Sequence, residues 1–217
     1  MKKHVVGMAG VFLAIAAVSA NAADLSVKGY IVPASCSFTI TNSVIDYVRI
    51  DPNILSATAS TRLEAKSTPY VIKCGSHAKA KVGIKAIDNR AATRISGLAQ
   101  AHWGGNYNDT YNYGLGATAS GQKIGGYTIH LRNSVADSKA VGVITSTNNG
   151  ATWYAGGQAL GHGNNIGSWH TGNSLPVALN VLSGTLEVQA IINKTSELDM
   201  SRQINLDGQA TLELRYL

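Results

Sequence analysis

Short runs of alternating apolar and polar residues recur along the whole chain, and they constrain its fold more than any other feature. A half-buried strand alternates in this way, because successive side chains point to opposite faces of the sheet. Glycine, asparagine, serine or proline interrupts the runs, and 23 of the 217 residues are glycine. Many short strands separated by turn residues predict an all-β fold, an antiparallel sandwich or barrel. The seven best strand candidates are residues 25–31, 70–74, 81–86, 127–131, 140–143, 186–190 and 210–216.

The N-terminus has the three parts of a secretory signal. Met1, Lys2 and Lys3 precede an apolar run at residues 11–18, and Ala20-Asn21-Ala22 supplies a small-residue cleavage site. The apolar run is shorter than the roughly 20 residues that a membrane-spanning helix needs. We therefore expect residues 1–22 to be a signal peptide. Residues 23–217 are then a single exported domain that does not span a membrane.

The charge balance argues against a nucleic-acid partner. The chain has 18 Lys and Arg against 12 Asp and Glu, and its net charge of +6 falls to +4 when the two lysines of the signal are removed. These basic residues are spread along the chain and do not form the clustered face of a nucleic-acid-binding protein.

Both cysteines, Cys36 and Cys74, lie in the exported part. An oxidising compartment favours a disulfide over two free thiols. A bridge across this spacing would stabilise the fold by about 3 to 4 kcal/mol in the chain-entropy model.

Two stretches, residues 97–126 and 156–173, are rich in Gly and Asn and are predicted to be long loops. Aromatic rings beside amides can offer stacking faces and hydrogen bonds to a sugar, which makes these loops a candidate glycan-contact surface. The alternative, which we favour, is that the aromatic residues fold back and cover the sandwich. The candidate residues are Trp103, Tyr107, Tyr111, Tyr113 and Trp169.

The segment 146–153, Ser-Thr-Asn-Asn-Gly-Ala-Thr-Trp, resembles the Asp-box of sialidase-type propellers, with Asn148 in place of Asp. A propeller would repeat the box in each blade, and the chain has one copy. The pattern therefore predicts a structural hairpin, in which Ser146 and Asn148 bond the turn backbone, Gly150 adopts a positive φ and Trp153 packs beneath.

No combination of residues predicts an enzyme, a cofactor or a metal site. The chain lacks a nucleophile beside a base, and no histidine pair has metal-ligand spacing. Asp88 follows a predicted strand, where we expect it to cap a turn and to be held by the nearby Arg90.

Both ends of the exported chain resemble the subunits of chaperone-usher fimbriae. The resemblance rests on Gly29-x-Ile31 before Cys36, on Cys74 at the end of a strand, and on a terminal alternating strand with Tyr216 as the penultimate residue. In that family the two cysteines bridge the first two strands, and the periplasmic chaperone recognises the C-terminal strand. The resemblance therefore implies that Leu212, Leu214 and Tyr216 pair with the chaperone.

A closer resemblance is to a fimbria-like family of exported proteobacterial proteins of unknown function. It extends over nearly the whole exported chain. The matching segments are residues 46–47, 74, 88–90, 113–116, 123–125, 146–153 and 206–217.

These resemblances imply an immunoglobulin-like (pilin-like) antiparallel β-sandwich that lacks its last strand and has a groove beside the C-terminal strand. A chaperone strand would fill this groove first, and the N-terminal extension of another subunit would replace it. The implied partners are a periplasmic chaperone, an outer-membrane usher, other fimbrial subunits and a surface glycan. The implied location is the periplasm and then the fimbrium at the cell surface.

The N-terminal extension departs from the fimbrial pattern. If cleavage follows Ala22, only residues 23–28 precede Gly29, and Leu25 and Val27 already have the pattern of the first strand. A donor strand needs roughly eight to ten residues. The sequence thus predicts a tip or minor subunit for cell attachment that accepts a strand without donating one. The alternative is a self-contained periplasmic β-sandwich, a binding or structural protein that does not polymerise.

Overall fold

The computed structural model describes residues 26–30, 35–75 and 78–217. The chain divides into two units, Met1–Val32 and Pro33–Leu217. In the first unit, the described residues 26–30 are exposed and form neither strand nor helix. The predicted signal peptide, residues 1–22, lies outside the described residues.

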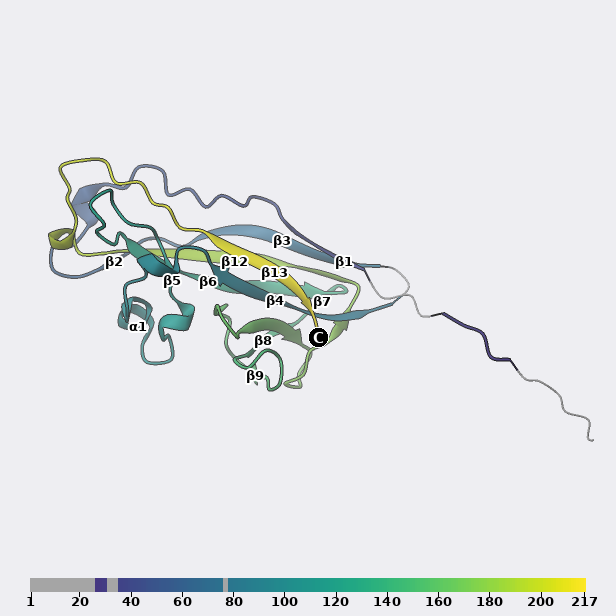
Figure 1. Cartoon of the computed structure of the whole chain (residues 1–217). Helices are drawn as coiled ribbons and strands as arrows, with labels where there is room; N and C mark the ends of the chain where they lie inside the picture. The colour runs from purple at the N-terminus through teal and green to yellow at the C-terminus, as the bar shows by residue number, and fades with distance from the viewer. Residues whose placement is uncertain (1–25, 31–34, 76–77) are drawn as a thin grey trace, which may run out of the picture. The chain divides into compact units, whose positions relative to one another are not determined.

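The second unit consists of two sheets in which all strand pairs are antiparallel (Figure 1). The first sheet has the order β1 (Cys36–Ile40), β3 (Lys66–Cys74), β12 (Val181–Ile192), β6 (Gly125–Ala136) and β5 (Tyr113–Gly114), with β2 (Thr61–Arg62) on β12 and β7 (Lys139–Ala140) on β6. The second has the order β11 (Ala178–Leu179), β4 (Ala80–Asp88), β10 (Ile166–His170), β8 (Gly142–Ser146) and β9 (Tyr154–Ala155), with β13 (Ala210–Tyr216) on β4. The predicted all-β antiparallel sandwich is confirmed.

Helical segments are short and lie in the connections. They are α1 (Leu98–Trp103) and the 3₁₀ turns η1 (Pro52–Ile54), η2 (Ala91–Thr93), η3 (Asp109–Tyr111) and η4 (Thr195–Glu197).

The core lies between the sheets and is built from alternate residues of their strands. Tyr70 and Ile72 of β3 and Ile84 of β4 are fully buried, as is Trp169 of β10. The Trp169 indole N–H donates to Ser134 Oγ at 3.0 Å, so its polar atom keeps a partner inside the core. Each large apolar side chain buried in this way contributes roughly 1.5 to 3 kcal/mol.

Six of the seven predicted strands are present, at β3, β4, β6, β7–β8, β12 and β13. The seventh, residues 25–31, lies partly outside the described residues, and its described part, 26–30, is not a strand. The prediction that residues 156–173 are all loop was wrong, because they contain β10. This strand is buried on both faces and so has no alternating pattern, and a Cβ on Gly167 would lie 2.9 Å from the Leu131 side chain.

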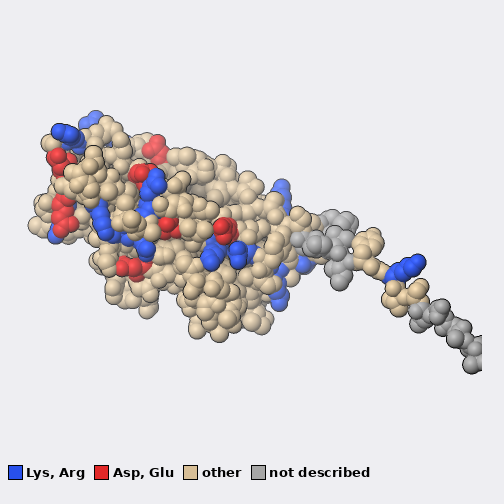
Figure 2. Space-filling model, in the orientation of Figure 1, with Lys and Arg blue, Asp and Glu red and all other residues tan. Residues whose placement is uncertain are grey.

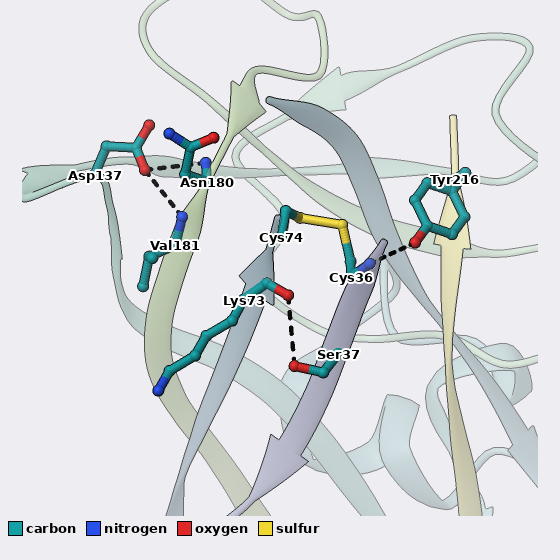
Figure 3. Close-up of a disulfide and its surroundings, with 8 residues drawn as sticks. All are labelled: Cys36, Ser37, Lys73, Cys74, Asp137, Asn180, Val181 and Tyr216. Atoms are coloured by element: carbon teal, nitrogen blue, oxygen red, sulfur yellow. Dashed lines mark hydrogen bonds between the residues drawn. A yellow bond between two sulfur atoms is a disulfide. The ribbon is translucent and has the colours of Figure 1, made fainter. Parts of the chain in front are cut away.

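The disulfide between Cys36 and Cys74 is present, as predicted (Figure 3). The two residues are directly opposite each other in the antiparallel pair of β1 and β3. The bridge therefore fastens the first residue of β1 to the last residue of β3.

Candidate functional site

Among the edge strands of the sandwich, β1 and β13 each lack a partner on one side. Among the described strands, β13 pairs only with β4, in a register that runs from Ala210 opposite Asp88 to Tyr216 opposite Val82. In the other sheet, β1 pairs only with β3. The free edges of β1 and β13 therefore retain backbone donors and acceptors that a further strand could use.

A groove of about 770 Å³ lies between these two edges. One wall is formed by β1 and the segment after it, residues 38–47, and the other by residues 206–212. Its floor consists mainly of apolar residues that belong to the core of the sandwich: Leu115, Tyr127, Ile129, Leu186, Val188 and Ala190. The groove thus gives access to the core along one side of the sandwich.

The apolar side chains of the groove walls are only partly buried. Phe38 and Ile40 of β1 pack against the core while remaining partly exposed, and so do Leu206, Ala210 and Leu212 on the opposite wall. Covering them with another strand would remove further apolar surface from water, which favours association.

One end of the groove is spanned by Tyr216, whose hydroxyl accepts a hydrogen bond from the Cys36 backbone N–H at 2.6 Å (Figure 3). Of the three residues predicted to pair with a chaperone, only Leu212 lines the groove. Leu214 packs against the core but does not line the groove, and Tyr216 is 57% exposed beside the disulfide. The structure therefore gives these three residues different surroundings along one strand.

Near the other end, Arg90 fixes the segment that leads into β13. Its Nε and Nη2 each donate to the Asp207 carboxylate at 2.9 Å, and Nε also lies 3.1 Å from the Asp207 carbonyl oxygen. These hydrogen bonds and the Asp207 charge raise the pKa of Arg90. Asp207 was not among the predicted site residues, although it lies only three residues before β13, in the segment 206–217 that resembles the family of unknown function.

The prediction that Arg90 holds Asp88 was wrong. The Asp88 carboxylate, 2% exposed, forms an ion pair with Arg94 Nε at 3.2 Å and accepts hydrogen bonds from the backbone N–H groups of Arg90 and Gly114. Asp88 does cap the turn after β4, as predicted. The Arg90 side chain is instead engaged by Asp207, which is distant in sequence and therefore could not be identified from local spacing.

The candidate glycan-contact residues do not form one surface. Tyr113 and Trp169 are fully buried, so their assignment to an exposed surface was wrong. Trp103 stacks on Tyr107 with ring centroids 5.6 Å apart, and Tyr107 is followed by Tyr111 at 5.7 Å. These three side chains are half-buried, which agrees with the alternative that the aromatic residues fold back over the sandwich.

Below this aromatic group lies His130, which is 2% exposed. The Tyr107 hydroxyl is 3.2 Å from His130 Nε2, while His130 Nδ1 has no hydrogen-bond partner among the described residues. Burial, aided by the nearby Arg132, lowers the pKa of His130 to about 4. The side chain is therefore uncharged at neutral pH.

The hairpin predicted for residues 146–153 is present between β8 and β9. Ser146 Oγ accepts hydrogen bonds from the backbone N–H groups of Asn148 and Gly150, and Asn148 Oδ1 accepts from the Thr152 N–H at 2.9 Å. Gly150 has a φ of +92°, and Trp153 lies half-buried beside it. The motif serves a structural purpose in this chain.

Charged residues are mixed on the visible face, where Lys and Arg alternate with Asp and Glu without a large region of one sign (Figure 2). Within residues 26–30, 35–75 and 78–217, no group of three His, Cys, Asp or Glu side chains could hold a metal ion. The same residues include no helix long and apolar enough to cross a bilayer.

The described residues contradict the expectation that Val27 belongs to the first strand. Residues 26–30 are exposed and form no strand, with Val27 at 92% and Tyr30 at 91% exposure. The first strand of the described residues begins at Cys36. Residues 26–30 are therefore not taken up by a strand of their own, whereas the count of six residues before Gly29 depends on the predicted cleavage after Ala22, which lies outside the described residues.

Comparison with known proteins gives similarity without a function. A family described as "Protein of unknown function (DUF1120)" matches residues 25–128. Protein GltF of Escherichia coli (strain K12) is 26% identical over 243 aligned positions, which cover 94% of each chain. The uncharacterized protein YhcF of the same organism is 24% identical over 234 positions, which cover 95% of each chain. The expected similarity to a family of unknown function is thus found, and none of these three descriptions names a fimbria.

Proposed function

We propose that this protein is a strand-accepting subunit of the fimbrial type, which a periplasmic chaperone and an outer-membrane usher assemble at the cell surface for attachment. The observation that supports the proposal most directly is the apolar groove between the unpaired edges of β1 and β13. An extended segment of another protein would add a strand to β13 and place alternate side chains in the groove.

The size of the groove gives the expected strength of this interaction. The groove wall formed by the start of β13 and the segment before it extends over residues 206–212. Inward positions recur at every second residue of a strand, so an inserted strand of this length would place about three or four side chains inside. At roughly 1.5 to 3 kcal/mol each, their burial would contribute about 5 to 12 kcal/mol before the entropy of ordering the strand is subtracted. The same apolar edge left open would favour aggregation, which explains a need for a chaperone.

The proposal is not restricted to a fibre tip. Residues 25, 27, 29 and 31 are Leu, Val, Gly and Ile, which alternate with polar residues and Tyr30. This alternation is the pattern of a donor strand. The described residues 26–30 form no strand of their own, so pairing within the described structure does not compete with donation. We therefore include an internal position in the fibre.

One contact favours the alternative, a self-contained periplasmic sandwich. The hydrogen bond from Cys36 to Tyr216 already joins the two groove walls at one end. A protein that keeps its groove closed by such contacts would fold and remain soluble alone, and it would have no need of an added strand.

Strand acceptance can be tested with the exported chain purified without a chaperone. A synthetic peptide of residues 23–33 is added, and the unfolding temperature and the monomer fraction are measured. We expect the peptide to raise both, because it covers the groove. A soluble monomer that melts cooperatively at the same temperature with and without the peptide would reject the proposal in favour of the self-contained sandwich.

Two matched variants locate the effect. Leu212→Glu places a charge in the groove wall and should abolish the peptide effect, whereas Leu175→Glu, at a residue that is 59% exposed and does not line the groove, should retain it. Chaperone capture, measured by co-purification, should be lost on deletion of residues 215–217. Undiminished capture by that deletion would reject the role assigned to Tyr216.

A further inference from the structure

A second, smaller pocket lies where three segments singled out in the sequence meet. It has a volume of about 340 Å³. The first long loop contributes η3, the β8–β9 hairpin contributes Thr147, and the second long loop contributes residues 162–165. The lining residues are Asn108, Thr110, Tyr111, Thr147, His162, Gly163, Asn164 and Asn165.

The chemistry of this lining is polar and uncharged. Every lining residue except Gly163 has a side chain that can form hydrogen bonds, and none is Asp, Glu, Lys or Arg. Amides offer a donor and an acceptor together, as hydroxyl groups do, so such a wall matches a ligand whose own groups both donate and accept. The main groove, by comparison, has an apolar floor.

Several of these side chains have hydrogen-bonding capacity to spare. Asn165 is 6% exposed, and its Oδ1 has no hydrogen-bond partner among the described residues, although its Nδ2 donates to the His162 carbonyl at 2.9 Å. The side chains of Thr147 and Asn164 and the hydroxyl of Tyr111 likewise form no hydrogen bond within the described part of the chain. A buried acceptor without a partner is costly, so a ligand that satisfied it would gain affinity.

The charges behind the pocket are engaged elsewhere. Arg94 Nη1 lies 2.9 Å from His162 Nε2, and the Arg94 Nε forms the ion pair with Asp88. The Asp109 carboxylate accepts hydrogen bonds from Ser96 Oγ and the Gly97 N–H. Burial and the Arg94 charge lower the pKa of His162, which keeps its ring neutral. Among the described residues that line or back this pocket, Arg94 and Asp109 are thus already engaged, which disfavours an ionic ligand.

We propose that this pocket binds a neutral saccharide residue, with Asn108, Tyr111, Asn164 and Asn165 as its hydrogen-bonding groups. The inference rests on the proposed role in attachment and assigns it a site and a ligand class. The volume is at the low end for small-molecule sites, which suits one or two sugar rings. Tyr111 is the one member of the predicted glycan surface that lines the pocket, and its aromatic ring would add apolar contact with a sugar to the hydrogen bonds of the amides.

The test is saturation-transfer NMR on the whole exported chain with defined sugars. The neutral probes are the methyl glycosides of galactose, mannose, fucose and N-acetylglucosamine, and the acidic probes are glucuronic acid and N-acetylneuraminic acid. At about 10 mM ligand, a Kd near 1 mM would give about 90% occupancy, so weak binding is still detected. We expect transfer to at least one neutral probe and none to the acidic ones.

Matched variants assign the site. Asn164→Ala and Tyr111→Phe each remove one hydrogen-bonding group and should weaken binding about 3- to 10-fold. Asn53→Ala and Tyr154→Phe remove the same groups at exposed residues outside the pocket lining and should bind as the wild type does. Asn164 is exposed and bonds its neighbours only through its backbone, so its replacement leaves the fold intact.

Three results would overturn the inference: no binding of any neutral probe, binding of acidic probes alone, or neutral binding that is unchanged in Asn164→Ala and Tyr111→Phe. The peptide assay of the main groove is independent of this measurement. Strand acceptance without sugar binding would reject the pocket alone, and sugar binding without strand acceptance would reject fimbrial assembly alone.

Discussion

His130 should make the stability of this protein depend strongly on pH. In the folded chain its pKa is lowered from 6.5 to about 4, because the ring is buried beneath Tyr107 and lies close to Arg132. In the unfolded chain the ring returns to its ordinary pKa and takes up a proton first. The unfolded state therefore binds more protons between pH 6.5 and pH 4, and folding stability falls as the pH is lowered through this window.

The magnitude follows from the two pKa values. Between pH 7 and pH 5 the loss attributable to His130 is about 2 kcal/mol, and below pH 4 it approaches about 3 kcal/mol. The replacement His130→Gln keeps a group that can bond the Tyr107 hydroxyl but removes the titration. The free energy of unfolding is measured in urea at pH 7 and at pH 5. Its decrease between these two pH values should be about 2 kcal/mol smaller in His130→Gln than in the wild type.

The comparison uses the difference between two pH values, so any constant cost of the substitution cancels. His170→Gln is the control, and because it retains His130 it should lose about as much stability on acidification as the wild type does. Equal losses in His130→Gln and the wild type would refute the assignment of a depressed pKa to this buried ring.

Three further changes should affect stability, each measured by urea or thermal unfolding. Replacing Cys36 and Cys74 together by Ala should lower the free energy of unfolding by about 4 kcal/mol in the chain-entropy model, and a loss below about 1 kcal/mol would contradict it. Asp88→Ala should cost about 3 to 5 kcal/mol, since it leaves a charged partner and two backbone donors without their acceptor; a loss within about 0.5 kcal/mol would show that water replaces the carboxylate. Gly114→Ala should prevent or greatly weaken folding, because the added Cβ would collide with a backbone carbonyl, whereas Gly105→Ala has open space and should be tolerated; equal stability of the two would refute the packing argument.

The sequence predicted those parts of the fold that depend on local pattern. Alternation located β13 at residues 210–216 with its exact bounds, since this edge strand has one face towards the core and one towards water. The helix α1 was missed because it is only six residues long and lies between Gly97 and Gly104, both with positive φ, in a segment whose composition is typical of a loop.

The candidate site was only partly predictable, because it depends on which distant segments meet. The resemblance to fimbrial subunits identified Leu212 and the groove beside it. The opposite wall residues, Phe38 and Ile40, belong to β1, whereas the alternating pattern predicted the first strand at residues 25–31. The aromatic residues illustrate the same limit. The composition of its loop made Trp169 a candidate surface residue, yet its side chain is fully buried in the core. No local sequence signal distinguishes a buried tryptophan from an exposed one in such a segment.

The position of the disulfide has a mechanical consequence. Cys36 is the first residue of β1, and its partner Cys74 ends the next strand of the sheet. Tension applied to the chain before Cys36 therefore passes through a covalent bond into β3, and it does not peel β1 away one hydrogen bond at a time. If the protein is pulled from its N-terminal side, as a fibre subunit would be, this wall of the groove would stay in place under load.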